Sequence, residues 1–241
     1  MKQARWLFHI YCSLIAFSVL GSAVSTWLKI DPGPIRPIAA FLLILSGTAC
    51  IAIEIQSALS LAWIAVVSII AETVGLYTGY PFGPYEYTGQ WWPSIPIGSH
   101  HTFPLLLPFA WILIVGGSYS VVRTRLKSWG AILATGLVAA AIDAPMERAM
   151  TDVFHYWVWR CPGPIFGVPV LNSIGWFVVA SIAAFGISRQ SQEILHQELA
   201  PKVLALFCGF IVVSGSLAFF DRAWLALGVI VVLLTLNLRS D

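Results

Sequence analysis

The chain has 241 residues, of which 59% are hydrophobic and only 10% are charged, and its mean hydropathy is +0.85. Soluble domains carry about 25% charged residues, so the composition excludes an ordinary soluble protein and indicates an integral membrane protein embedded in the lipid bilayer. The formal net charge of +2 is too small to favour a nucleic-acid partner. The four cysteines show neither CxxC nor zinc spacing, and three of them lie in apolar segments, so we expect no disulfide framework and no metal site.

Long apolar segments recur along the chain. A helix needs about 20 mostly apolar residues to cross the hydrocarbon core of a bilayer. We therefore predict an all-α, polytopic integral membrane protein with seven or eight transmembrane helices in a single membrane domain, 1–241. The last two segments are short and joined by Asp221–Arg222, so a re-entrant hairpin is the alternative to two full spans. The predicted spans are roughly 5–28, 35–55, 57–77, 103–122, 129–149, 169–187, 203–220 and 222–238.

Positive charges predict the orientation. Lys2 and Arg5 precede the first segment, which has no small-residue cleavage site, so we expect a retained helix rather than a removed signal peptide. With eight spans, eight Lys and Arg residues lie at the ends on the N-terminal side and five at the opposite ends. We therefore expect a cytoplasmic N-terminus in the inner membrane of a bacterial or archaeal cell. In either orientation the loops 78–102 and 150–168 emerge on the same face, because two spans separate them.

Ionisable side chains inside the predicted spans are rare, and in a bilayer such residues are functional candidates because they are costly to bury. Glu72 lies within the third span, about two turns before a long loop. Asp143 and Glu147 lie near the end of the fifth span, and their i, i+4 spacing places both carboxylates on one helix face. We interpret Glu54, at the end of the second span, as an interfacial charge.

The pair of carboxylates in the fifth span has two interpretations. Pro145 lies between them and is expected to kink or end the helix, and Arg148 is a candidate ion-pair partner. The group could therefore be a structural polar cluster at a helix end. The pair and Glu72 both lie near the same membrane face, and this convergence favours a functional site instead.

Two loops on that face combine aromatic rings with turn-forming residues. The first, GYPFGPYEYTG from Gly79 to Gly89, has no Lys or Arg and one carboxylate, Glu86, which we expect to face solvent. The second lies between Asp152 and Phe177 and is also rich in rings and prolines. Such rigid, ring-walled loops suit a binding mouth for a large apolar ligand or a cation. Aromatic residues also mark membrane interfaces, and we assign four tryptophans to that role: Trp63, Trp91, Trp92 and Trp129.

Several reaction classes lack their sequence motifs. The chain has no histidine boxes, no GxGxxG for a bound dinucleotide, no DDxxD for a magnesium diphosphate and no GxSxG. What remains is carboxyl groups beside aromatic rings. A carboxyl group shielded from water can stay protonated and act as a general acid. Protonating an alkene gives a tertiary carbocation, which rings can shield and a water can capture, so this chemistry needs no cofactor.

Two runs of residues stand out along the chain. The first consists of Glu72, Gly75, Gly79, Pro81, Phe82, Gly83, Tyr85 and Tyr87. The second consists of Asp143, Glu147, Trp157, Trp159, Gly167, Val168, Pro169, Asn172, Gly175 and Trp176. These runs resemble signatures of the carotenoid biosynthesis membrane-protein family, and in particular carotenoid 1,2-hydratases of the bisanhydrobacterioruberin-hydratase type. The resemblance covers roughly 60–187 and leaves 203–238 as C-terminal helices outside it. In the family pattern the second carboxylate is often Asp followed by Pro, whereas here Arg148 follows Glu147.

The resemblance implies a hydro-lyase that adds water across the C1–C2 double bond of an acyclic (ψ) carotenoid end group and gives a 1-hydroxy carotenoid. Other enzymes of the carotenoid pathway are then candidate partners. Asp143 or Glu147 would donate the proton, and Glu72 would orient water or share the proton. Substrate-binding residues would be Phe82, Tyr85, Tyr87, Trp157, Trp159 and Asn172.

Two alternatives stay open. The small heterodimeric lycopene cyclases resemble the chain more loosely and carry a carboxylate pair shortly after a proline turn. Here Pro169 is followed by Val170, Leu171 and Asn172, with no carboxylate. A cyclase or isomerase acting on a ψ end group is therefore the second choice, and a non-enzymatic carotenoid-binding membrane protein is the third.

Overall fold

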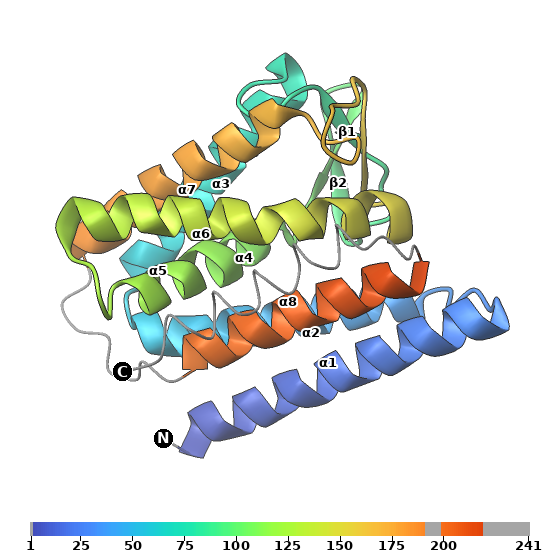
Figure 1. Ribbon diagram of the computed structural model, residues 1–241, viewed down its shortest axis with the longest axis horizontal. Coiled ribbons are helices and arrows are strands. Elements are labelled where there is room, and N and C mark those ends of the chain that lie inside the picture. The colour runs from blue at the N-terminus through green and yellow to red at the C-terminus, as the bar shows by residue number, and fades with distance from the viewer. Residues whose placement is uncertain (1, 191–198, 219–241) are drawn as a thin grey trace.

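Helices dominate the computed structural model, which describes residues 2–190 and 199–218 (Figure 1). Within these residues, six helices are long and apolar enough to cross a membrane, and a shorter apolar helical segment covers Leu107–Val122. The predicted all-α, polytopic class is therefore confirmed. The predicted span 222–238 lies outside the described residues. The six long helices are α1 (Lys2–Leu28), α2 (Ile35–Ile55), α3 (Ala58–Thr78), α6 (Ser128–Arg148), α7 (Val170–Gln190) and α8 (Leu199–Ala218).

The boundaries of α2 and α3 follow from local chemistry. Gln56 ends α2 in the left-handed conformation (φ 52°), and Ser57 then caps α3 by accepting a hydrogen bond from the Ser60 backbone N–H (3.1 Å). Gly79 ends α3 with φ 77°, a conformation that glycine adopts without strain, and its N–H bonds Gly75 O at 2.7 Å. Two spans are thus joined by a tight turn, and the second leads straight into the ring-rich loop.

The predicted span 103–122 is not one continuous helix. The span expected at 103–122 begins as strand β3 (His101–Pro104) and becomes helical only at α4 (Leu107–Trp111). A buried π-helical turn, η1 (Ile112–Gly116), then joins α4 to α5 (Gly117–Val122). A π-turn widens the helix locally and is frequent at functional sites.

Pro145, which we expected to kink or end the fifth span, does not end it. Helix α6 continues through this proline to Arg148 and passes directly into the π-helical segment η2 (Ala149–Val153). The continuous helical segment Ser128–Val153 is 26 residues long. Both carboxylates of the pair therefore lie inside a helix that other elements surround, and not at a frayed end.

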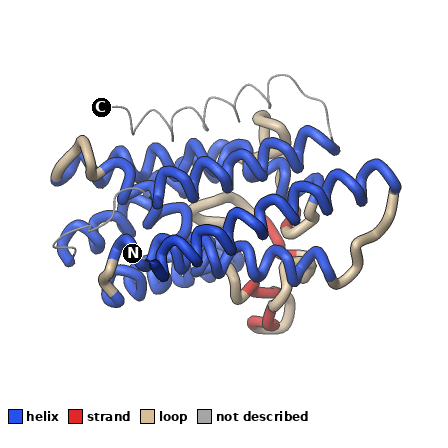
Figure 2. The backbone as a smooth tube through the Cα atoms, turned by 90° about the horizontal axis from the view of Figure 1, so that it is seen from below, coloured by secondary structure: helices blue, strands red, loops and turns tan. Residues whose placement is uncertain are grey.

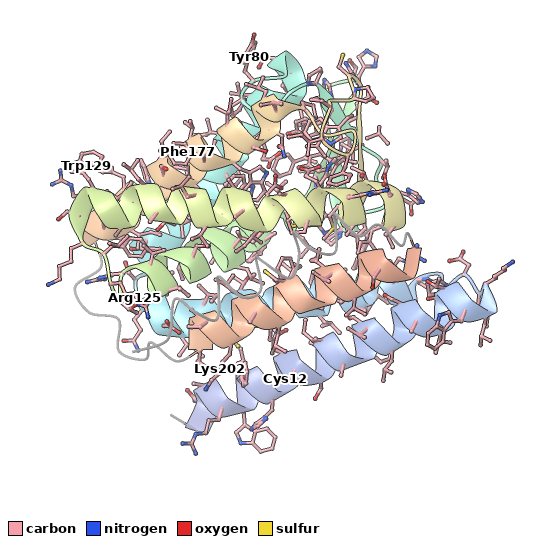
Figure 3. All side chains as sticks on the ribbon, viewed as in Figure 1. Cys12, Tyr80, Arg125, Trp129, Phe177 and Lys202 are labelled. Carbon is pink, nitrogen blue, oxygen red and sulfur yellow. The ribbon has the colours of Figure 1, made fainter. Side chains whose placement is uncertain are left out.

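Short strands join the two ring-rich loops, a feature the sequence pattern did not predict. Strand β1 (Tyr85–Tyr87) pairs antiparallel with β4 (Trp157–Trp159), and β2 (Ser94–Ile97) pairs with β3. The strands form a small group at one edge of the helices (Figure 2). Tyr80 lies at that end of the bundle, whereas Arg125 and Trp129 lie at the other (Figure 3). The expectation that both loops emerge on one face is confirmed.

Glu54 is not the interfacial charge that we expected. Its side chain is fully buried, and its Oε2 accepts a hydrogen bond from the backbone N–H of Ala200 at 2.8 Å. Ala200 lies in the first turn of α8, where unpaired N–H groups and the helix dipole favour a negative charge. Glu54 therefore joins the end of α2 to the start of α8.

Removing this contact should destabilise the fold. Glu54→Ala should lower the free energy of unfolding by about 1–3 kcal/mol, because a buried N–H loses its acceptor. Thermal unfolding in detergent micelles, followed by tryptophan fluorescence, measures the change. Glu86→Ala is the matched control: this half-exposed carboxylate pairs with Arg160, and such surface pairs contribute only about 0–1 kcal/mol. Equal shifts in Tm for both variants would contradict the role of Glu54.

Candidate active site

A cavity lies among α3, the α4–η1 segment, α6 and α7, beside the β1–β4 pair, and spans about 590 Å³ of space between atoms, including space open to the surroundings. Its lining is dominated by aromatic rings with a few polar groups. The polar residues of the wall are Glu72, Glu147 and Asn172. The rings of the wall are Phe82, Tyr85, Tyr87, Trp91, Trp111, Trp157, Trp159, Trp176 and Phe207.

Two phenol hydroxyls and one indole N–H hold Glu72 in place. Its Oε2 contacts the hydroxyls of Tyr85 (2.5 Å) and Tyr87 (2.9 Å), and its Oε1 accepts a hydrogen bond from Trp111 Nε1 (3.0 Å). Both tyrosines come from β1, in which alternate side chains point to the same face. Gly75, one turn after Glu72, makes room for Tyr85, since a Cβ there would lie 3.0 Å from the Tyr85 hydroxyl.

Glu147 is held in a matching way by β4 and α7. Its Oε2 accepts hydrogen bonds from the indole N–H groups of Trp157 and Trp159, each at 3.0 Å. Its Oε1 accepts one from Asn172 Nδ2, also at 3.0 Å. Indole and amide N–H groups only donate, so the surroundings of Glu147 suit an ionised carboxylate.

Asp143 lies one turn before Glu147 and behind it. The same amide nitrogen, Asn172 Nδ2, donates to Asp143 Oδ2 at 2.6 Å and so bridges the two carboxyl groups. Oδ1 of Asp143 has no hydrogen-bond partner among the described residues. Asp143 is 1% exposed and is not one of the described residues that line the cavity. The pair therefore has an inner member and a member that faces the cavity.

The rings around the carboxylates pack against one another. The register of the β1–β4 pair sets Tyr85 opposite Trp159 and Tyr87 opposite Trp157, with centroid distances of 5.5 Å and 6.1 Å. Tyr85 and Tyr87 meet edge to face at 5.5 Å. Such contacts fix the ring faces that border the cavity, and ring faces stabilise positive charge.

A second ring pair lies on the helical side of the cavity. The indoles of Trp111 and Trp176 stack at 4.1 Å with an interplanar angle of 9°. Because Trp111 also donates to Glu72, this stack joins the carboxylate on α3 to α7. The ring centroid of Phe82 lies 6.2 Å from that of Trp111, and Phe82 also belongs to the wall of the cavity.

The structure brings together the residues that the sequence singled out as a site. Eight of the nine line the cavity, and Asp143 lies directly behind Glu147. Arg148, a candidate partner of the carboxylate pair, instead forms an ion pair with Asp152 at 3.2 Å and lies over the ring of Phe166. Glu86 is half-exposed and paired with Arg160, as its solvent-facing assignment predicted. The described residues hold no group of three or more His, Cys, Asp or Glu that could bind a metal ion.

Three tryptophans of the wall were not predicted as site residues. Trp91, assigned to the membrane interface, is buried and lines the cavity, whereas Trp63, Trp92 and Trp129 are exposed. Trp111 lies in the middle of a predicted span, away from either interface, and that position was a usable signal. The third, Trp176, belongs to the second family-like run but was not assigned to the site.

These features define a class: a polytopic α-helical membrane protein with buried carboxyl groups around a ring-lined cavity. The chain belongs to the carotenoid biosynthesis protein family, whose model matches residues 37–237. It is 26% identical over 187 residues to bisanhydrobacterioruberin hydratase from Haloarcula japonica, a match that covers 73% of this chain. The match covers 61% of the relative, so the chain spans less than two thirds of that protein's length. No solved structure matches this chain.

The tyrosines at Glu72 should resist ionisation. Burial, and then the nearby Glu72 carboxylate, raise the pKa of both Tyr85 and Tyr87 well above the usual value of about 10. Both phenols therefore stay neutral as the pH rises through that value. The double variant Tyr85→Phe/Tyr87→Phe should gain as much phenolate absorbance between about pH 8 and about pH 11 as the wild type.

Stability gives the same test a second readout. A folded-state pKa above the unfolded one means that the folded protein holds more protons above about pH 10, so stability should fall with rising pH there. The fall in Tm over this range should be smaller in the double variant. A double variant that loses two tyrosines' worth of phenolate absorbance would contradict the buried, bonded state of these phenols.

Proposed function

We propose that this protein is a cofactor-free carotenoid hydratase, which adds water across the C1–C2 double bond of an acyclic (ψ) carotenoid end group. The observation that carries the proposal is the facing of two buried carboxyl groups, Glu72 and Glu147, into one ring-lined cavity, with Asp143 behind the second. Membership of a carotenoid biosynthesis family and similarity to a hydratase support it. The substrate would be an acyclic carotenoid dissolved in the bilayer.

The carboxyl pair on α6 supplies the proton in this scheme. Two adjacent buried carboxyl groups do not both ionise readily, because like charges repel in a medium that screens them poorly. The pair therefore holds one proton. Three N–H donors favour the resting charge on Glu147, and the unpartnered Oδ1 of Asp143 suits the proton. When the proton passes to Glu147, that residue becomes the acid that faces the substrate.

The addition then proceeds in two steps. Glu147 transfers its proton to C2 as the π bond breaks, which leaves a tertiary cation at C1 and two negative carboxylates beneath it. A water held by the Glu72 carboxylate attacks C1 and gives up a proton to Glu72 as the C–O bond forms. Return of that proton to the pair on α6 restores the site, so the net change is the addition of one water.

The aromatic walls have two roles in the scheme. The faces of the rings that border the cavity stabilise the transient cation. Their packing also limits the water that can reach it, so capture is confined to a water held at Glu72. The hydroxyls of Tyr85 and Tyr87, bonded to Glu72 at 2.5 and 2.9 Å, keep that carboxylate in place.

Expression in cells that make lycopene or another ψ-ended carotenoid tests the reaction. Pigments should gain the mass of one water for each end that reacts. An isomeric product of unchanged mass would point to a cyclase or isomerase. Unchanged pigment across several acyclic substrates, together with pigment that co-purifies with the protein, would point to a carotenoid-binding protein without activity.

Removing the acid–base groups should abolish turnover without loss of fold. Glu147→Gln, Asp143→Asn and Glu72→Gln should each lower the rate of product formation by about 10²-fold or more, because general acid–base catalysis contributes that much. Asp152→Asn is the control: this carboxylate lies on η2 and pairs with Arg148, and it should leave the rate nearly unchanged. Protein levels and Tm in detergent show whether each variant folds. Full activity in all three site variants would overturn the scheme.

A further inference from the structure

A second cavity adjoins the carboxylate cavity and spans about 740 Å³ of space between atoms, including space open to the surroundings. It lies between the later half of α1, the first half of α2 and α8. Figure 1 shows these three helices side by side. The two cavities are neighbours, because they share four wall residues, which come from α2, η2, α8 and the loop between β1 and β2. The shared residues are Ile44, Trp91, Met150 and Phe207.

A ladder of stacked rings runs along the second cavity towards the first. Phe210 stacks on Phe154 at 6.0 Å, and Phe154 stacks on Tyr156 at 5.5 Å. Tyr156 in turn stacks on Trp91 at 5.3 Å with an interplanar angle of only 8°. Trp91 lies 6.1 Å from Trp157, whose indole binds the cavity-facing carboxylate. The ladder thus connects the second cavity to the reacting end of the first.

Small residues form another part of the wall. Helix α1 contributes Ser18, Gly21, Ser22 and Ser25, and their i, i+3, i+4, i+7 spacing places them on one helix face. A Cβ built on Gly21 would meet nothing within 4 Å, so the space beside it is open. Small side chains on one helix and near-parallel rings elsewhere make a slot suited to a thin, flat ligand.

We propose that this second cavity holds the polyene chain of the carotenoid while its end group occupies the carboxylate cavity. The inference rests on the proposed function. A carotenoid is a long conjugated rod, so a molecule with one end at Glu147 must leave the first cavity in some direction. The second cavity adjoins the first, and its stacked rings match the flat face of a conjugated chain.

The four shared residues form the neck between the two cavities. Trp91 is both the last ring of the ladder and part of the wall near Glu147. Met150 also belongs to both walls, and the flexible thioether of methionine adapts to irregular apolar surfaces. The substrate enters between α1, α2 and α8 and slides end first through this neck.

Filling the slot tests the proposal. Gly21→Phe places a ring in the open space of the second cavity, remote from the carboxylates. Ala16→Phe is the matched control on the same helix, because Ala16 is exposed and lies about 140° away around the helix axis. Both variants and the wild type are expressed in cells that make a ψ-ended carotenoid, then purified in mild detergent.

Two readouts separate this proposal from the proposed function. The molar ratio of co-purified pigment to protein should fall at least fivefold in Gly21→Phe and stay at the wild-type value in Ala16→Phe, whether or not water is added. Where the wild type hydrates its substrate, the conversion of full-length carotenoid relative to a ten-carbon compound with the same end group should also fall at least fivefold in Gly21→Phe.

Equal pigment ratios in the two variants would overturn the proposal. So would a Gly21→Phe protein that keeps its pigment but loses a bound phospholipid in native mass spectrometry, since the slot would then hold lipid acyl chains. A wild type that binds pigment without hydrating it, combined with pigment loss in Gly21→Phe, would support the slot and refute the hydratase.

Discussion

Burial of negative charge is the constraint on which the rest of this structure depends. A carboxylate taken out of water costs several kcal/mol unless it is paired or hydrogen-bonded, and this protein buries Glu72, Glu147 and Asp143 within one region. The donors that offset the cost are mainly aromatic: two phenols, three indoles and one amide. The rings are therefore both the hydrogen-bonding partners of the carboxylates and the apolar walls around them.

This double use of the rings explains the short strands at the end of a helical bundle. An extended segment presents every second side chain on one face, so YEY and WVW each direct two donors inward and one residue outward. Antiparallel pairing of β1 with β4 sets the two donor pairs opposite each other and satisfies the backbone between them. A helix could not do this with the same spacing, because residues two apart on a helix face different directions.

Predictions from the sequence were most accurate where one local feature decides the structure, such as the length of an apolar segment or the helical spacing of two carboxylates. The limits predicted for the second span, 35–55, match α2, and the i, i+4 carboxylates do share a face that meets Asn172. Strands of three residues are too short to show a period, and the π-turn in 112–116 has no apolar signature distinct from that of a helix. Glu54 was misassigned because its partner, Ala200, is 146 residues away, and no local pattern reports such a contact.

The two carboxylates that face the cavity differ in the kind of donor that holds them, and this difference fits the different roles that we propose for them. A phenol both donates and accepts, so the hydroxyls at Glu72 can adjust whether that carboxyl group holds a proton or not. Indoles only donate, so the contacts of Trp157 and Trp159 disfavour a proton on Oε2 of Glu147. A weakly held proton is what protonation of an isolated alkene requires, and a tolerant carboxylate is what deprotonation of a water requires. The difference in donors thus supports our proposal that the acid lies on α6 and the base on α3. Indoles in place of the phenols at Glu72, or phenols in place of the indoles at Glu147, would remove the basis for that assignment.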